Sequence, residues 1–229
     1  PKNLTSFPHP LLSSETDLLS FAMNNSFETL FDSEQMPIRS ADKEIYLLGH
    51  QARTSDGLGM RWLMNNASLD ELYLSTLTNY LLIDLYHGNN RTIPIHSTYS
   101  LAKNQLIDII LQNTVAVSGI CESHPFHLHG HKFWIHSQGE GLYNPTQPVK
   151  RPILRDTLTL YATSFSDLAP DRSTTNYLKP CGWTKLRFIA DNPGLWLLHC
   201  HIGSHVYMGM NILIQEDIEH LSINYLSKS

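Results

Sequence analysis

The sequence has few charged residues, few cysteines and no long apolar run. Asp, Glu, Lys and Arg make up 16% of the 229 residues, the formal net charge is -5, and no stretch of eighteen apolar residues occurs. Nucleic-acid-binding proteins are usually basic, and a membrane-spanning helix needs about 20 consecutive apolar residues. We therefore expect neither nucleic acid nor a membrane among the partners of this chain.

Three cysteines are too few for a disulfide-rich scaffold. One of them, Cys200, lies between two histidines in "GLWLLHCHIGSHVYMGM" (194–210). If Cys200 is reserved for chemistry, Cys121 and Cys181 remain as an even pair. A disulfide between them suits an oxidising compartment, and two buried free thiols are the alternative.

The start of the chain and its sequons bear on localisation. The opening "PKNLTSFPHPLLSS" has no initiator Met and lacks the basic and apolar regions of a signal peptide, so we expect a mature product or a cut piece. Asn-x-Ser/Thr sequons are acceptors for glycan in secreted proteins. Their number favours a secreted glycoprotein, with candidate sites at Asn3, Asn24, Asn66 and Asn90.

The chain divides into two zones. Residues 1–41 are rich in Ser, Asn and Pro and are expected to form an irregular linker or wrapping segment. From residue 42 to 229, short apolar or alternating runs are separated by turn signals, which is typical of an all-β sandwich or barrel. The runs are "LIDIILQN", "KFWIHS", "DTLTLYA", "TKLRFIAD", "GLWLLHCH" and "MNILIQE".

Strand geometry gives a reason for the His-Cys-His order. Successive side chains of a strand point to opposite faces, so His199 and His201 share one face while Cys200 points to the other. One strand can thus serve two metal sites. A thiolate, imidazoles and a weak axial thioether form a blue-copper site. Cys200, His205 and Met210 supply three such ligands, although Met208 competes with Met210 on spacing alone.

A second histidine cluster lies in "ESHPFHLHGHKFWIH" (122–136). His127 and His129 share a face there, and His124 lies at a turn from which it can reach the Cys200 site. His131 and His136 have a spacing that suits packing or hydrogen bonding to ligands. Zinc is the rival metal, but structural zinc sites usually contain CxxC pairs, and this chain has none.

The motifs "HPFHLHGH" and "HCHIGSHVYMGM" resemble the C-terminal copper-binding signatures of the multicopper oxidases, a family that includes laccases, ascorbate oxidases and ferroxidases. The resemblance implies a cupredoxin-like Greek-key β-sandwich or barrel over residues 42–229. It implies type 1 copper ligands at His124, Cys200, His205 and Met210. It also implies a type 2 ligand at His127 and type 3 ligands at His129, His199 and His201.

The same resemblance implies an activity. The type 1 copper takes single electrons from a small reductant, and a trinuclear copper cluster reduces O2 to water. The stretches "GEG" (139–141) and "GWTKLRFIADNPGLW" (182–196) resemble the ascorbate oxidase branch. The stretch "EIYLLGHQARTSDGLGMRWLMNNASL" (44–69) resembles it too, and on that match Trp62 corresponds to a tryptophan of the substrate pocket beside His205, with an ordinary core aromatic as the alternative. Laccase and ferroxidase remain alternatives. A ferroxidase needs carboxylates near the type 1 copper, and only Glu122 is obviously near.

Two departures from the family pattern stand out. Many members carry an acidic residue directly after "HCHI", where this chain has Gly203. A trinuclear cluster needs eight histidines, and the chain has no further His-x-His motif outside the two signatures. We therefore expect a second chain with N-terminal cupredoxin domains to supply four more histidines. A lone cupredoxin that only transfers electrons is the alternative, but it has no use for the four cluster ligands.

Overall fold

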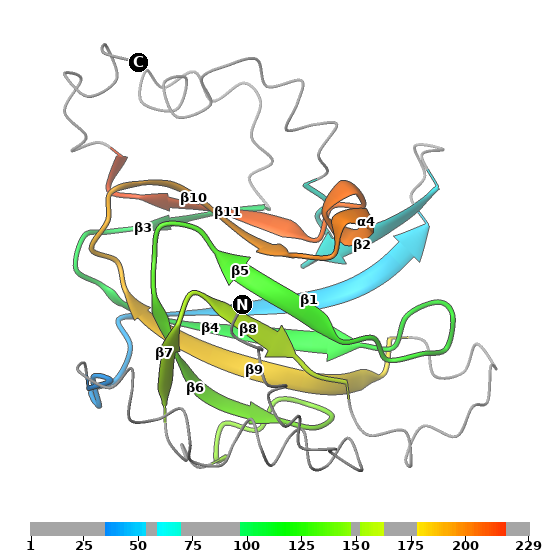
Figure 1. The fold of residues 1–229 in the computed structure, drawn as a ribbon, viewed down its shortest axis with the longest axis horizontal. Helices are drawn as coiled ribbons and strands as arrows, with labels where there is room; N and C mark the ends of the chain where they lie inside the picture. Colours follow the sequence, from blue (N-terminus) through cyan, green and yellow to red (C-terminus); the bar gives the residue numbers. More distant parts are fainter. Residues whose placement is uncertain (1–34, 54–58, 70–96, 148–151, 163–177, 219–229) are drawn as a thin grey trace, which may run out of the picture. The chain divides into compact units, whose positions relative to one another are not determined.

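The computed structural model describes residues 35–53, 59–69, 97–147, 152–162 and 178–218. Within these ranges almost all regular structure is β-strand, with one short helix, α4 (Gly203–Tyr207). Each of the six apolar runs singled out in the sequence contains a strand (Figure 1). The prediction of an all-β fold is confirmed.

The strands form two sheets, shown as two layers in Figure 1. The six-stranded sheet has the order β2 (Met60–Met64), β1 (Lys43–Arg53), β4 (Leu106–Thr114), β9 (Pro180–Ile189), β6 (Phe133–Gly139) and β7 (Ile153–Arg155). The five-stranded sheet has the order β3 (Thr98–Leu101), β11 (Asn211–Glu216), β10 (Gly194–Cys200), β5 (His124–Leu128) and β8 (Thr157–Leu160).

Most neighbouring strands are antiparallel, and two pairs are parallel. β1 runs parallel to β4, and β11 runs parallel to β3. In both parallel pairs the two strands are far apart in the sequence. Parallel strands cannot be joined by a tight hairpin, so the chain forms other strands before it returns to the same sheet. The adjacent strands β10 and β11 pair antiparallel, which places the chain segment between Cys200 and Asn211 at one end of the sheet.

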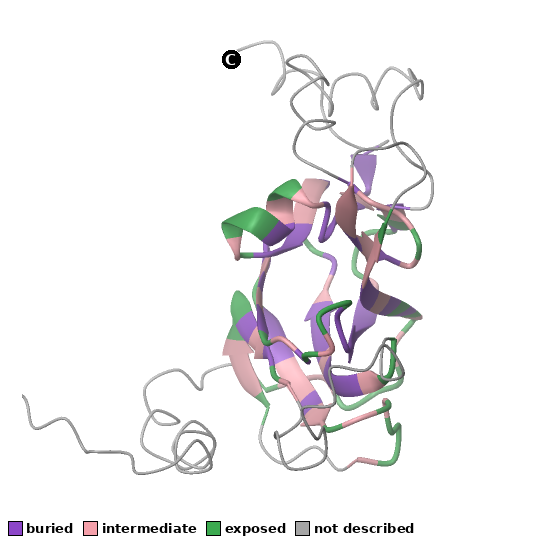
Figure 2. Ribbon diagram, turned by 90° about the vertical axis from the view of Figure 1, so that its right-hand side faces the viewer, coloured by how far each residue is buried: buried purple, intermediate pink, exposed green. Residues whose placement is uncertain are grey.

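The hydrophobic core draws on both sheets. Figure 2 shows buried segments in both layers. The six-stranded sheet contributes Leu47, Ile109, Leu186 and Phe188, and the five-stranded sheet contributes Phe126, Leu128, Leu198 and Ile212. Cys200 and Met210 belong to the same cluster and are 0% exposed. The residues with candidate metal chemistry are therefore anchored in the main core.

The predicted boundary at residue 41 lies close to the first strand, since β1 begins at Lys43. Residues 1–34 lie outside the described residues. Residues 35–42 contain no helix or strand, and Arg187 of β9 donates hydrogen bonds to the carbonyls of Pro37 (2.7 Å) and Arg39 (3.1 Å). The role of the N-terminal segment as a linker or wrap stays a prediction.

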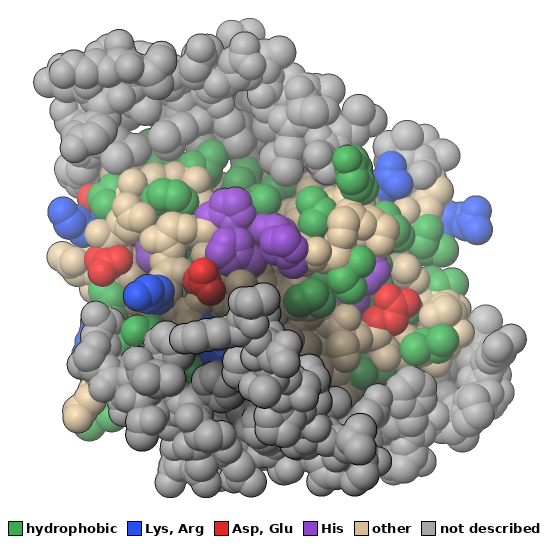
Figure 3. All heavy atoms as spheres, in the orientation of Figure 1, with side chains coloured by type: hydrophobic (Ala, Val, Ile, Leu, Met, Phe, Trp, Pro, Cys, Tyr) green, Lys and Arg blue, Asp and Glu red, His purple; other side chains and the backbone are tan. Residues whose placement is uncertain are grey.

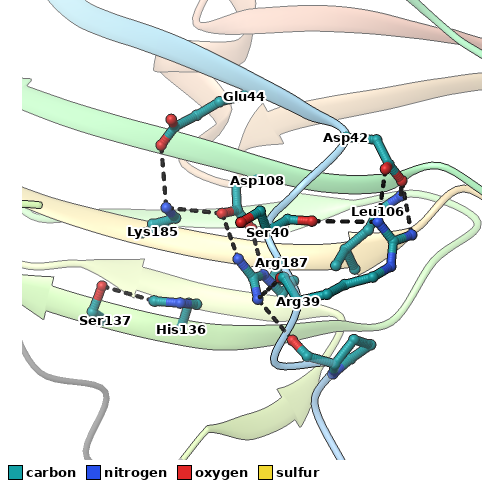
Figure 4. Close-up of polar contacts among 11 residues, drawn as sticks. Arg39, Ser40, Asp42, Glu44, Leu106, Asp108, His136, Ser137, Lys185 and Arg187 are labelled. Atoms are coloured by element: carbon teal, nitrogen blue, oxygen red, sulfur yellow. Dashed lines mark hydrogen bonds and ion pairs between the residues drawn. The ribbon is translucent and has the colours of Figure 1, made fainter.

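Arg187 also belongs to a buried charge cluster in the six-stranded sheet (Figure 4). Its Nε and Nη2 donate to the Asp108 carboxylate over 2.6 and 2.8 Å, and Lys185 Nζ lies 2.8 Å from the same carboxylate. Burial alone would raise the pKa of Asp108. The hydrogen bonds from Arg187 and Lys185 outweigh it, so the pKa is lowered from 3.8. The Asp108 carboxylate is therefore charged in the folded protein.

We expect Asp108→Ala to destabilise the fold by about 3–5 kcal/mol, because it leaves buried Arg187 without its carboxylate. The exposed Lys185 partner Glu44 provides the control, and Glu44→Ala should cost less than about 1 kcal/mol. Urea unfolding measures both. Since the pKa of Asp108 is lowered, its contribution is complete above pH about 4 and declines as the pH falls further. Equal losses in the two variants would contradict this account.

Candidate metal centre

Three side chains from separate elements meet at one buried point. His124 begins β5, Cys200 ends β10, and His205 lies in α4. The Nδ1 atoms of the two histidines are 3.2 Å apart, and Cys200 Sγ lies 3.9 Å from His124 Nδ1 and 3.6 Å from His205 Nδ1. All three residues are buried, and their donor atoms lie within 4.8 Å of one another.

Local backbone geometry produces this convergence. β5 and β10 pair antiparallel, with Cys200 opposite Phe126, and the His201 N–H donates to Pro125 O over 2.7 Å. The chain then turns at once into α4, where the His205 N–H donates to Ile202 O. One helical turn therefore brings the His205 ring back beside Cys200.

The donor set suits copper. Burial, with a further contribution from His205, lowers the pKa of His124 to about 3, and burial lowers the pKa of His205. Both imidazoles are thus neutral and can donate a lone pair to a metal. Burial raises the pKa of Cys200 to about 11, and Cys200 takes part in no disulfide. A soft thiol beside two neutral imidazoles is the combination that copper prefers.

Two methionines compete as the axial ligand. Met210 is 0% exposed, and its backbone joins both other segments: its N–H donates to His205 O, and its carbonyl accepts from the Cys200 N–H. Met208 is half-buried at the C-terminal end of α4. The burial and backbone contacts of Met210 support it, and its role as ligand stays a prediction.

A second group of histidines lies on the other side of the same two strands. The rings of His127, His129, His199 and His201 gather with centroid separations from 4.9 to 6.3 Å. Figure 3 shows histidine side chains collected on one face of the molecule. His127 lies directly opposite His199 in the β5–β10 pair. We call these residues the four-histidine cluster.

Nitrogen atoms in the four-histidine cluster are oriented for metal binding. His127 Nδ1 lies 2.8 Å from Asp156 O and His199 Nδ1 lies 2.9 Å from Cys200 O, so Nε2 is the candidate ligand atom of each ring. The Nε2 atoms of His129 and His199 lie 3.1 Å apart. Backbone contacts to the second ring nitrogen are the usual way in which proteins orient metal-binding imidazoles.

Comparison with known proteins identifies the family. Residues 66–220 match the family model described as "Multicopper oxidase", which is more than half of the chain. The chain belongs to the multicopper oxidase family. Copper is the metal of this family, and the site formed by His124, Cys200 and His205 is consistent with type 1 copper.

Relatives within the multicopper oxidases include several enzymes. An L-ascorbate oxidase of Nicotiana tabacum is 32% identical over 224 residues, which cover 87% of this chain and 35% of that protein. Laccase-13 of Arabidopsis thaliana is 40% identical over 125 residues, 54% of this chain and 19% of that protein. The chain therefore spans about a third of the length of the first curated relative it matches.

Solved structures of multicopper oxidases share the fold. A laccase from Botrytis aclada superimposes with a TM-score of 0.56 at 22% identity, over 80% of this chain and 30% of that chain. The cupredoxin-like architecture is thus confirmed. Among the described residues, no helix is both long and apolar enough to cross a membrane.

Trp62 lies beside the candidate type 1 ligands His124 and His205. Its ring centroid lies 4.7 Å from that of His124 and 5.1 Å from that of His205, and its backbone N–H donates to Met208 O. The side chain is 0% exposed. Trp62 therefore packs against two candidate ligands, His124 and His205, and stacking on a reductant would require its ring to be uncovered. That role stays a prediction.

The remaining cysteines form a disulfide. Cys121 and Cys181 are joined with an S–S distance of 2.05 Å, so the alternative of two free thiols is not what the structure contains. The bond links the segment before β5 to β9. It thereby ties the start of the "ESHPFH" segment to the opposite sheet.

The sequons are only partly covered by the described residues. Asn66 is exposed in the turn after β2, with a positive φ of 65°. Its sequon partner Ser68 donates a hydrogen bond to Met208 O over 3.2 Å. Asn3, Asn24 and Asn90 lie outside the described residues. Glycosylation stays a prediction at all of these sites.

Two acidic residues near the histidines matter for the chemistry. Glu122 Oε2 lies 3.4 Å from His205 Nε2, on the edge of the ring that faces away from Cys200. Glu216, which the sequence analysis did not single out, is fully buried 2.9 Å from His131. In the sequence, the only sign of a buried carboxylate is that Glu216 ends the apolar run "NILIQE". Its partner His131 lies 85 positions away, so no local pattern links the two residues.

Proposed function

We propose that this chain is the C-terminal part of a secreted oxidase that oxidises a small reductant, with ascorbate favoured, and reduces O2 to water. His124, Cys200, His205 and Met210 would hold the type 1 copper. His127 would hold the type 2 copper, and His129, His199 and His201 the type 3 pair. Bound at these positions, copper supplies one-electron redox chemistry.

One observation carries this proposal: a single strand serves both groups of ligands. Cys200 points into the core toward His124 and His205, while its neighbour His199 points to the four-histidine cluster. The Cys200 carbonyl lies 2.9 Å from His199 Nδ1. Cys200 and its two flanking histidines therefore provide a short covalent path between an electron entry site and an O2 site.

The four-histidine cluster supports sharing with another domain. His129 and His201 are exposed, and the chain has no further His-x-His motif to complete an eight-histidine set. We propose that a second chain covers this face and supplies four histidines through a large obligate interface. A lone electron-transfer cupredoxin is the alternative function, but an exposed four-histidine cluster has no role in it.

The choice of ascorbate as reductant rests on the similar proteins and on the acidic residues near the His205 ring. L-ascorbate oxidase from Nicotiana tabacum aligns with most of the chain, whereas Laccase-13 aligns with about half. Hard cations such as iron are bound by several carboxylates. Among the described residues, His205 forms its ion-pair contact with one carboxylate, Glu122. This arrangement favours a small organic reductant over Fe(II).

Secretion and glycosylation are part of the proposal. The Cys121–Cys181 disulfide and the sequons support an oxidising, extracellular environment. Treatment of the native protein with a glycosidase should reduce its mass, and the peptide containing Asn66 is the first to examine because this residue is exposed.

We expect the native protein to oxidise ascorbate with a higher kcat/KM than phenols or Fe(II). Oxygen uptake with each reductant under identical conditions measures the three values. A higher value for a phenol or Fe(II) would replace ascorbate oxidase with laccase or ferroxidase and leave the copper assignments in place. Absence of O2 consumption with every reductant would instead favour the electron-transfer module.

A further inference from the structure

A buried carboxylate lies beside His131, two residues along the chain from His129 of the four-histidine cluster. Glu216, the last residue of β11, is 0% exposed, and its Oε2 lies 2.9 Å from His131 Nε2. The two atoms are close but lack the alignment of a regular hydrogen bond. Burying a charged carboxylate costs folding free energy unless nearby polar groups replace the hydrogen bonds that it loses to water. The proposed electron path uses neither Glu216 nor His131.

Both residues connect to the backbone of a candidate copper ligand. His131 Nδ1 lies 3.2 Å from the carbonyl oxygen of His129. Glu216 Oε1 accepts a hydrogen bond from the Asn192 N–H over 2.7 Å, and Asn192 Nδ2 donates to Gly130 O over 2.9 Å. The carbonyls of both His129 and Gly130 are therefore contacted by one network that is centred on Glu216.

The turn at Gly130 has little freedom to move. Gly130 has a φ of +73°, and a Cβ at this position would lie 2.5 Å from the ring of Trp196. Trp196 Nε1 in turn donates to Asn192 O over 2.7 Å. The Gly130 backbone thus packs directly on the Trp196 ring. Asn192 is hydrogen-bonded to both, through its side chain to the Gly130 carbonyl and through its own carbonyl to Trp196 Nε1.

The His129 side chain itself has few other supports. It is exposed, and its Nε2 lies 3.1 Å from His199 Nε2. The His129 N–H donates to Leu197 O over 3.0 Å. Besides the ring contacts to His127 and His199, the contacts at its own carbonyl and at Gly130 hold the backbone from which the ring extends.

We propose that Glu216 and His131 are positioning residues that hold His129 in the direction required for a type 3 copper ligand. The inference rests on the proposed function, because it assigns a task within the shared copper cluster. Residues that orient metal ligands typically change metal affinity or activity about 10–100-fold when they are replaced. We expect an effect of this size on the copper bound at His129.

Three variants separate positioning from folding. Glu216→Gln retains an acceptor for the Asn192 N–H and a polar group beside His131. Glu216→Leu removes the acceptor of the Asn192 N–H and the polar group beside His131, and therefore leaves the buried His131 ring without its partner. The double variant Glu216→Leu/His131→Phe removes both polar partners together, and the new ring can keep the packing of His131 against Phe188 and Trp196.

The experiment uses the copper-loaded holoenzyme and measures total copper and the copper visible by electron paramagnetic resonance (EPR). A bridged pair of Cu(II) ions is EPR-silent through coupling, and a displaced ligand uncouples or releases it. We expect the double variant to lose EPR-silent copper, with about 10–100-fold weaker binding, while the blue colour persists. Glu216→Gln should retain most of the EPR-silent copper.

The double variant overturns the proposal if its EPR-silent copper and copper affinity equal those of the unmutated protein. Asp108→Asn serves as the control, because it removes a buried carboxylate from the other sheet. It should lower the unfolding midpoint and leave the EPR-silent copper unchanged; a loss equal to that of the double variant would also overturn positioning. Absence of EPR-silent copper from the unmutated protein would contradict the proposed shared cluster itself. Its presence in the unmutated protein and, undiminished, in the double variant would contradict only the positioning role of Glu216 and His131.

Discussion

Cys200→Ser is expected to abolish both the blue colour and the oxidation of reductant. The buried Cys200 thiol is the soft donor between His124 and His205, and its bond to copper is the source of intense visible absorption in blue-copper sites. A serine hydroxyl fills nearly the same space but is a poor copper ligand. The fold should therefore remain while the electron entry site is lost.

The measurements are visible absorption, total copper and O2 uptake in the native protein and the variant. Ser204→Ala is the matched control, because Ser204 is exposed in α4 next to His205. It should leave colour and activity unchanged. A blue Cys200→Ser protein would show that the type 1 assignment is wrong. Loss of colour in both variants would instead indicate that α4 tolerates no substitution near His205.

The isolated chain is expected to bind a type 1 copper but to reduce no O2. All four candidate type 1 ligands belong to this chain, and three of them already lie together. Under the proposed function the four-histidine cluster is half of an eight-histidine set, so type 2 and type 3 coppers should bind weakly or not at all without a partner. Copper affinity depends on the completeness and geometry of the ligand set.

The test is to purify the chain alone, add copper, and measure the colour, tightly bound copper and O2 uptake. His124→Ala and His129→Ala form a matched pair within this experiment. The first should eliminate the blue colour, and the second should leave it intact, because His129 lies in the other group of ligands. Reduction of O2 to water by the isolated chain would disprove the two-chain proposal.

Much of the fold and of the ligand set could be predicted from sequence because the signals are local. The alternation of apolar residues in runs such as "GLWLLHCH" is a property of the strand itself. The same alternation predicts that Cys200 and His199 serve different sites, and Cys200 is indeed in the core while His199 contacts the four-histidine cluster. The two histidine-rich motifs lie within segments of fewer than twenty residues.

Contacts between distant segments could not be predicted in this way. The buried position of Trp62 beside His124 and His205 depends on the pairing of β1 with β2 and on the hydrogen bond from the Trp62 backbone N–H to Met208 O, and its role at a substrate pocket stays a prediction. The choice between a disulfide and two thiols also depended on how closely Cys121 approaches Cys181, 60 positions away. Neither distance is encoded in a local pattern.

By itself, then, the sequence determined the all-β class, the copper chemistry of the donor set and the division of His199 and Cys200 between two faces. The tertiary structure decided which residues meet. The β5–β10 register brings His127 opposite His199, α4 returns His205 to Cys200, and β11 places Glu216 beneath His131. Local periodicity fixes the face on which a side chain lies, whereas long-range pairing and core packing fix its neighbours.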